Sequence, residues 1–403
     1  MAQRTPAWLR ELVTAHRPGY TLPQSFYNDP RIFELDTERI FMKCWLFVGH
    51  EALIPDPGDY FLYSIAGESI IVVRDAEGQV QAMYNVCRHR GSRVCHEQRG
   101  QVKSFVCPYH GWTYARDGAL LAAKRMPPDF EKSEWGLHKC HVEQVQGLVY
   151  ISLAEHPKDF THFRDDMNAA FTPHGLADAK IAHQMTWRVS ANWKLVWENF
   201  QECYHCAHAH PEYCQVQPEG VARSTESAVV RAAFDELVSS WREVDQKRRP
   251  KTHVHPITAD SLYVAVRTPF KPGYRSQSPS GALMAPLMGE MTELEGGMTC
   301  MATRPGHAVN ACPDHVCTFR FTPLAPDDTE VEITWLVAPH AVEDRDFQLD
   351  ELTWLWHKTT DQDAQIVTDN QKGVNSRRYV PGPYSEAESG PREIVAWYLR
   401  HFE

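Results

Sequence analysis

Two short segments, each pairing a cysteine with a histidine, constrain this chain more than any other feature of its sequence. The first is Cys87-Arg88-His89, and the second, after seventeen further residues, is Cys107-Pro108-Tyr109-His110. Each is short enough to form one β-turn loop that carries a soft thiolate and an imidazole. Two such loops can hold a two-iron, two-sulfur cluster, with both sulfurs on one iron and both imidazoles on the other. The spacing therefore predicts a small β-rich domain with two ligand loops.

The mixed pairing also bears on which metal is bound. Two neutral imidazoles in place of two thiolates reduce the negative charge at one iron and raise its reduction potential. The alternative is a structural zinc site, but zinc loops usually pair Cys-x2-Cys with His-x3–5-His. Gly91 and Gly111 follow the two histidines and suit tight loops around a cluster. Cys95 lies in the same stretch but outside the pattern, and we expect it to be a small buried hydrophobic residue.

Composition limits the classes of protein that fit. The chain has 403 residues, which indicates two or three domains, and 43% of them are hydrophobic. A net charge of -11 argues against nucleic-acid binding. Eleven scattered cysteines are a poor disulfide framework. The first residues carry no apolar signal core, and no apolar run is long enough to span a membrane. We therefore expect a globular protein of the reducing cytoplasm, without a membrane segment.

Periodicity predicts an α+β chain in three parts. Residues 1–42 form an N-terminal arm with a helix at 8–13, and we expect this arm to associate with the larger domain formed by residues 156–403. Residues 43–155 form the small all-β domain, with strands at 60–65, 70–74 and 80–84. Residues 156–403 form a larger domain of an antiparallel sheet with helices beside it. Its expected elements are helices at 193–208, 346–371 and 392–399 and strands at 316–321 and 331–337, whereas residues 218–286 give no clear pattern.

A second concentration of donors follows the motif Asn192–Asn199. Three histidines and two cysteines lie within eight residues, namely Cys203, His205, Cys206, His208 and His210. The cysteines could hold zinc together with His208 and His210. A non-haem iron oxygenase would instead need two histidines and one carboxylate on one face of the metal. Asp361 and Asp363, late in the long helix, are the best carboxylate candidates, although both could also be solvated helix acids. The spacing does not choose among these alternatives.

Taken together, these segments resemble the catalytic (alpha) subunits of Rieske non-haem iron oxygenases over almost the whole chain. The resemblance implies a small Rieske domain and a larger helix-grip catalytic domain. The family pattern Glu/Asp-x2-His-x4-His falls on Glu202, His205 and His210, so it implies that the two histidines bind iron. The family's third ligand is a late aspartate, which Asp363 matches best, with Asp361 as the alternative. Glu202 matches the acid that links a cluster histidine to an iron histidine of the neighbouring subunit.

Within that family, the motifs are most similar to quaternary-ammonium oxygenases such as stachydrine or glycine betaine demethylases. The supporting segments are 85–92, 192–199, 202–206 and 379–385, while Asn199-Phe200-Gln201-Glu202 departs from the Asn-Asn-Arg-Glu of that branch. The resemblance implies N-demethylation with release of formaldehyde. Electrons would come from NAD(P)H through a flavin and iron–sulfur reductase, and the subunits would form a homotrimer or a hexamer.

Three alternatives remain at the level of the sequence. The same machinery could hydroxylate an aromatic ring or aromatic acid, the chain could be an electron carrier with a cluster only, or it could be a zinc protein. A quaternary ammonium is held by aromatic faces, each contributing about 0.5–2 kcal/mol. The candidate aromatic residues in the second half are Trp187, Trp197, Tyr204, Tyr213, Tyr263 and Phe270.

Overall fold

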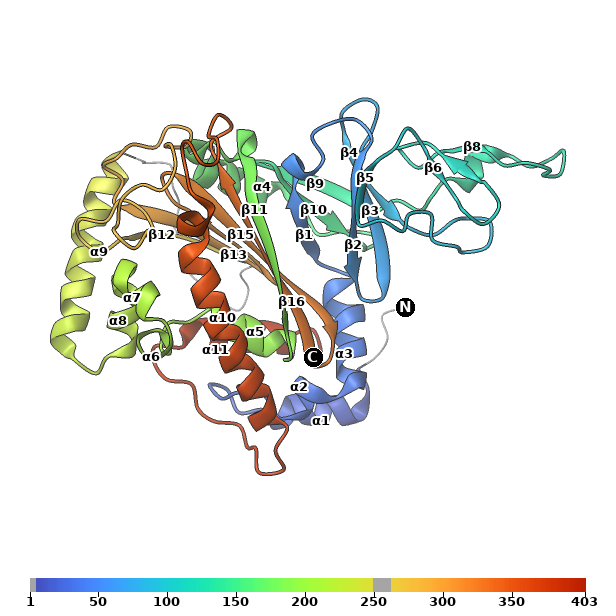
Figure 1. Cartoon of the computed structure of the whole chain (residues 1–403). Coiled ribbons are helices and arrows are strands. Elements are labelled where there is room, and N and C mark those ends of the chain that lie inside the picture. Colours follow the sequence, from blue (N-terminus) through green and yellow to red (C-terminus); the bar gives the residue numbers. More distant parts are fainter. Residues whose placement is uncertain (1–4, 249–261) are drawn as a thin grey trace. The chain divides into compact units, whose positions relative to one another are not determined.

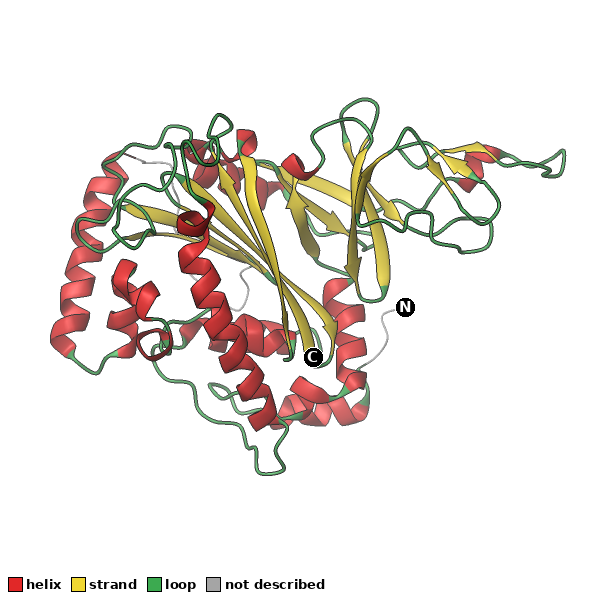
Figure 2. Cartoon of the chain, in the orientation of Figure 1, coloured by secondary structure: helices red, strands yellow, loops and turns green. Residues whose placement is uncertain are grey.

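The computed structural model describes residues 5–248 and 262–403, and backbone proximity divides the chain into two units (Figures 1 and 2). One unit is Phe41–Phe160, and the other combines Met1–Ile40 with Thr161–Glu403. Within the described ranges, no helix is both long and apolar enough to cross a lipid bilayer.

The unit Phe41–Phe160 consists of three small antiparallel sheets, as expected for an all-β domain. Their strand orders are β1-β10-β9, β4-β3-β2-β5 and β6-β7-β8. The strands are β1 (Trp45–His50), β2 (Asp59–Ile65), β3 (Glu68–Arg74), β4 (Val80–Tyr84), β5 (Arg99–Gln101), β6 (Phe105–Val106), β7 (Thr113–Tyr114), β8 (Leu120–Ala122), β9 (His141–Val145) and β10 (Leu148–Ser152). The strands predicted at 60–65, 70–74 and 80–84 are confirmed.

Local chemistry explains the hairpin between β2 and β3. Ala66 and Gly67 both have positive φ, at 58° and 80°, which is the backbone of the two-residue turn that matches strand twist. The run Ile70–Val73 in β3 is buried on both faces of its sheet. This run contributes to a core that also encloses Cys87 and Cys107, so the ligand loops begin from a rigid base.

The larger unit is built on a six-stranded antiparallel sheet with the order β11-β16-β15-β14-β13-β12. The strands are β11 (Lys180–Val189), β12 (Tyr263–Pro269), β13 (Gly297–Thr303), β14 (His307–Ala311), β15 (His315–Ala325) and β16 (Asp328–Val337). Phe321 on β15 pairs with Val331 on β16, and Phe319 lies two residues from Phe321. These three side chains therefore lie on one face of the sheet.

Helices complete the unit (Figure 2). They are α1 (Ala7–Ala15), α2 (Ser25–Asn28), α3 (Pro30–Asp36), α4 (Thr161–Phe171), α5 (Trp193–Phe200), α6 (Cys206–Ala209), α7 (Pro211–Val216), α8 (Pro218–Ser224), α9 (Ala228–Arg248), α10 (Leu349–Val374) and α11 (Ser389–Leu399). Trp356, Thr360, Asp363 and Val367 recur every three or four residues in α10, so they form one stripe on this helix. The long helix and the last helix are confirmed.

Two polar anchors fix α5, which precedes the donor-rich segment. The Asn192 side chain caps α5 by accepting from the Lys194 backbone N–H at 3.0 Å, and the Asn192 backbone N–H donates to Gln371 Oε1 of α10 at 2.9 Å. The buried Asp36 of α3 accepts from Lys194 Nζ at 2.5 Å and from Tyr398 Oη of α11 at 2.6 Å. These bonds hold α5 between the N-terminal arm, α10 and α11.

The structure corrects the prediction of one helix over 193–208. Helix α5 ends at Phe200, and α6 begins only at Cys206. In between, the Glu202 carboxylate accepts from the backbone N–H of Tyr204, so a local side-chain bond replaces the helical pattern. In the uninterpreted stretch 218–286 the structure has α8, α9 and β12, while residues 249–261 lie outside the described part.

Candidate metal centres

The two Cys/His segments of the β unit adopt the same loop backbone. The Cys87 N–H donates to the Ser92 carbonyl at 2.8 Å, and the Gly91 N–H donates back to the Cys87 carbonyl at 2.9 Å. The second loop repeats the pattern, because Cys107 bonds Trp112 at 2.8 Å and Gly111 bonds Cys107 at 3.0 Å. Gly91 and Gly111 have φ of +77° and +72°. A residue without Cβ adopts that conformation at no steric cost, as the tight loops were predicted to require.

These loops place the four predicted cluster donors in two layers. Cys87 and Cys107 are buried in the hydrophobic core. The Nδ1 atoms of His89 and His110 lie 3.1 Å apart, and His110 is exposed. Two soft sulfurs inside and two imidazole nitrogens outside are the donor set that a two-iron, two-sulfur cluster with mixed ligands requires.

Neighbouring side chains orient this donor set. Tyr114 Oη lies 3.2 Å from Cys87 Sγ and accepts from the Arg88 backbone N–H at 3.0 Å. The Trp112 ring stacks on His89, with centroids 5.0 Å apart and planes 8° from parallel. Cys95 is buried in the same core, and burial raises the pKa of its thiol to about 12. Cys95 is therefore a small buried core residue, as predicted.

The larger unit brings together three of the donors proposed for the second metal. His210 Nε2 lies 2.9 Å from Asp363 Oδ1 and 3.1 Å from His205 Nε2. His205 Nε2 and Asp363 Oδ1 are 3.5 Å apart. Within the described residues, this is the group of His, Cys, Asp and Glu side chains whose ligand atoms converge on one point, all within 4.8 Å. Two imidazoles and one carboxylate form the facial set of non-haem Fe(II) sites.

The end of α6 at His210, whose backbone is not helical (φ -128°, ψ 70°), lets His205 and His210 converge. His205 directly precedes α6, and His210 lies between the end of α6 and Pro211, the first residue of α7. Their separation of five residues would place them on different faces of a continuous helix. The non-helical backbone of His210, between α6 and α7, turns its ring toward His205 and toward Asp363 on α10.

Charged neighbours shift the pKa values of this group. Burial lowers the pKa of His205, but hydrogen bonds with Asp363 and Glu202 outweigh it and raise the pKa to about 9. Burial raises the pKa of Asp363, but its bonds to both histidines outweigh this and lower it. Glu202 Oε1 lies 2.5 Å from His205 Nδ1. The carboxylates of Glu202 and Asp363 lie beside the imidazoles of His205 and His210 and favour positive charge between them. A bound divalent cation would supply that charge.

The competing candidates lie outside the group. The carboxylate of Asp361 accepts from Trp187 Nε1 at 2.8 Å, and it does not join the three donors. His208 is exposed. Cys203 and Cys206 are joined in a disulfide, so in this structure they do not offer zinc the pair of thiolates that one alternative required.

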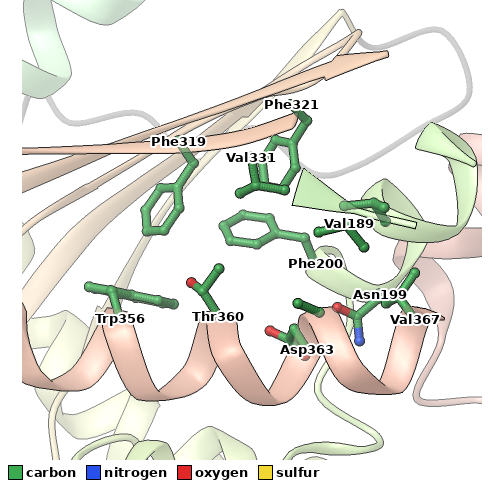
Figure 3. A pocket seen from close by; sticks show the side chains of 12 residues that line it. Val189, Asn199, Phe200, Phe319, Phe321, Val331, Trp356, Thr360, Asp363 and Val367 are labelled. Carbon is green, nitrogen blue, oxygen red and sulfur yellow. The ribbon is translucent and has the colours of Figure 1, made fainter. Parts of the chain in front are cut away.

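A cavity adjoins Asp363, and Figure 3 shows aromatic rings turned into it from the sheet and from α10. Its lining includes Phe200, Phe319, Phe321 and Trp356. Phe319 contacts Phe200 and Trp356 with centroid separations of 5.0 Å and 4.8 Å. None of the six aromatic candidates from the sequence lines this cavity. Two of them stand behind it, because Trp197 stacks on Phe200 and Tyr213 packs on Trp356.

Comparison with known proteins assigns a domain family to each of the two units. Residues 44–144 match the model of the Rieske [2Fe-2S] domain, and residues 176–403 match the ring hydroxylating alpha subunit (catalytic domain). The chain belongs to the Rieske oxygenase family. It is 37% identical over 392 residues to the glycine betaine monooxygenase oxygenase subunit of Pseudomonas aeruginosa, covering 96% of this chain and 90% of that protein.

Two further similarities were found for this Rieske oxygenase, one in sequence and one in structure. The carnitine monooxygenase oxygenase subunit of Acinetobacter pittii is 33% identical over 202 residues, which cover 48% of this chain and 54% of that one. A crystal structure of a quaternary ammonium Rieske monooxygenase with L-carnitine has a TM-score of 0.70 and 22% identity, covering 100% of both chains. The latter shows a shared fold.

Family membership establishes the enzyme class and the cofactor types. The chain is an oxidoreductase with a Rieske [2Fe-2S] domain and a catalytic domain of the mononuclear iron type. The side chains present fit both cofactors. The β unit offers two cysteine sulfurs and two histidine nitrogens for the cluster, and the larger unit offers two histidines and one aspartate for the mononuclear iron. Asn199 contacts His205 and Gln362 contacts His210, and neither residue was predicted to belong to the site. The sequence could have suggested both residues, because Asn199 ends the motif Asn192–Asn199 and Gln362 directly precedes Asp363.

Proposed function

We propose that this Rieske oxygenase removes an N-methyl group from a betaine or another small quaternary ammonium compound. The observation that carries the proposal is the aromatic cavity beside the facial set of His205, His210 and Asp363. A quaternary ammonium has no N–H to donate, so aromatic faces rather than hydrogen-bond acceptors suit it. The relatives named for glycine betaine and carnitine support the same substrate class.

In this proposal each donor has one role. Cys87, His89, Cys107 and His110 hold the [2Fe-2S] cluster, and His205, His210 and Asp363 hold the iron. The bound iron supplies oxygen activation, and hydroxylation of an N-methyl carbon gives a product that separates into formaldehyde and the demethylated amine. The protein's part is to hold the methyl group beside the three ligands. The rings of Phe200, Phe319 and Trp356 exclude water from that place and face the cation.

Electron supply completes the proposal. Electrons for the cluster, when it is bound, would come from NAD(P)H through a flavin and iron–sulfur reductase. Glu202 then links His205 to a cluster histidine of the neighbouring subunit, because a carboxylate can accept a hydrogen bond from both imidazoles. Such an arrangement needs a ring of subunits, and we propose a homotrimer, alone or paired as a hexamer. A cytoplasmic location fits thiolates that bind iron.

A second candidate is hydroxylation of an aromatic ring or aromatic acid. The observation that favours it is the apolar lining, since Val189, Val331 and three phenylalanines would also contact a flat ring. The two candidates differ in their products, because only demethylation yields formaldehyde.

The test is a substrate panel with the purified oxygenase, a reductase and NADH. Glycine betaine, proline betaine, carnitine, choline and benzoate would each be scored for oxygen uptake and formaldehyde. We expect one formaldehyde per oxygen consumed with at least one quaternary ammonium compound. If benzoate causes oxygen uptake and no compound yields formaldehyde, the proposal of demethylation is wrong and ring hydroxylation is supported.

A further inference from the structure

We propose that Glu212 and Gln362 form a positioning relay, which selects the tautomer and the orientation of His210 and thereby sets the affinity for iron. The proposal rests on the ligand set put forward above, since it assumes that His210 Nε2 binds the metal. Neither Glu212 nor Gln362 belongs to that set.

The relay is a chain of two hydrogen bonds that ends at the ligand ring. His210 Nδ1 lies 2.8 Å from Gln362 Oε1, and Gln362 Nε2 donates to Glu212 Oε2 at 3.1 Å. Gln362 directly precedes Asp363 on α10, whose Oδ1 lies 2.9 Å from His210 Nε2. Two consecutive residues of one helix thus contact the two nitrogens of one imidazole.

The chemistry of the outer partner fixes the direction of both bonds. A carboxylate only accepts, so Glu212 requires the amide nitrogen of Gln362 to point toward it. The amide oxygen is then left facing His210 and accepts from Nδ1–H. With its proton on Nδ1, the ring leaves the lone pair of Nε2 free for a metal.

The burial of His210 makes the inner bond important. The ring is 1% exposed, so its Nδ1–H has little access to bulk water, and Gln362 is the partner the structure provides. His205 differs, because Glu202 contacts its Nδ1 directly at 2.5 Å. One iron histidine therefore has a carboxylate as its partner, and the other has a neutral amide that a second carboxylate orients.

The experiment uses the full chain with its cluster intact and the mononuclear site reloaded with Fe(II). Affinity would be measured by competition with a ferrous chelator, and the electron paramagnetic resonance of the nitrosyl adduct would report ligand geometry. We expect Gln362→Leu to weaken Fe(II) binding by about 10–100-fold and to alter the nitrosyl signal. Cluster absorption and the unfolding temperature should stay unchanged.

Exchange of the two partners separates a relay from simple packing. Gln362→Glu alone places two carboxylates together and should weaken Fe(II) binding. Adding Glu212→Gln restores a donor and an acceptor between the two positions and should recover most of the affinity. Absence of recovery in the double variant would argue for packing and overturn the relay.

Control variants identify which proposal fails. Gln365→Leu, three residues along α10, removes an exposed amide that bonds Asp369 and should leave Fe(II) affinity unchanged. His210→Ala should abolish Fe(II) binding, and His208→Ala should not. If His210→Ala retains iron, the ligand set is wrong. If His210→Ala loses iron while Gln362→Leu keeps normal affinity and a normal nitrosyl signal, the relay is wrong and the ligand set stands.

Discussion

The two metal centres of this chain are assembled in different ways. All four proposed cluster donors lie within the 24 residues from Cys87 to His110, on two loops with the same hydrogen-bond pattern. The proposed iron donors come from three places, because His205 and His210 flank a four-residue helix and Asp363 lies 153 residues beyond His210.

The geometry of the cluster site depends on local structure, whereas the geometry of the iron site depends on long-range packing. Two glycines with positive φ and two cysteines in one small core are enough to shape the cluster loops. The iron centre depends on the position of α10, which buried bonds to α5 and packing against the sheet determine. Closing a long loop costs more conformational entropy than closing a short one, though only slowly with length. The cluster should therefore tolerate changes in the larger unit, and the iron centre should not.

The largest expected effect comes from a cluster ligand. Cys107→Ser replaces a buried soft thiolate by a weakly ligating hydroxyl, so the cluster should be lost and turnover should fall by at least about 1000-fold. Iron should drop from about three to about one per chain, which metal analysis and visible absorption would measure. If the variant keeps the wild-type absorption spectrum, Cys107 is not a ligand.

Removal of the proposed link between the centres should be nearly as damaging. Glu202→Ala deletes the carboxylate that contacts His205, so turnover should fall by about 100-fold or more even when excess Fe(II) keeps the mononuclear site loaded, and the cluster should be unchanged. Single-turnover reduction of the cluster, followed by its reoxidation, would measure the step. The control is Glu219→Gln, which changes an acid paired with Arg223. Normal reoxidation in Glu202→Ala would contradict the electron path.

The cavity should affect substrate affinity more than chemistry. Trp356→Leu removes one aromatic face beside Asp363, and the KM for a quaternary ammonium substrate should rise by about 2–30-fold, as expected for one cation–π contact. Steady-state formaldehyde release would measure it. Trp354→Leu, on the same helix and packed against a different cluster, serves as the control. An equal rise in KM in both variants would show that the cavity does not determine substrate specificity.

The smallest expected effect concerns the buried Glu198 on α5. Burial raises the pKa of its carboxyl to about 7, despite bonds from Tyr384 and Tyr27 and the charge of Lys194. The folded state therefore holds this proton more tightly than the unfolded chain does. The resulting stability is present below about pH 4.5 and is lost as the pH rises through about 7.

Glu198→Gln should accordingly flatten the pH dependence of the unfolding temperature between about pH 4.5 and 7. Thermal unfolding over this range, followed by circular dichroism, would measure it. The cluster spectrum should not change. An unaltered slope in the variant would show that another group carries the dependence.

Much of the architecture followed from local patterns. The alternation in the β unit and the stripe of α10 predicted their elements because burial on one or two faces leaves a periodic trace in the sequence. One helix over 193–208 was wrong, since the Glu202 side chain bonds the backbone of Tyr204 and interrupts it. The periodicity of apolar residues does not indicate such a bond. The aromatic lining was also missed, because its residues come from α5, β15 and α10, which are far apart in the sequence.

The sequence by itself determined the nature of both centres. Cys87, His89, Cys107 and His110 carry the cluster pattern in their spacing, because a loop of three or four residues has few backbone choices. His205 and His210 followed from their resemblance to a family motif. The tertiary structure decided which of Asp361 and Asp363 meets them, which rings enclose the cavity, and that Glu212 reaches His210 through Gln362. Those relations depend on strand register and on the rotation of α10, which long-range packing sets and neighbouring residues do not encode.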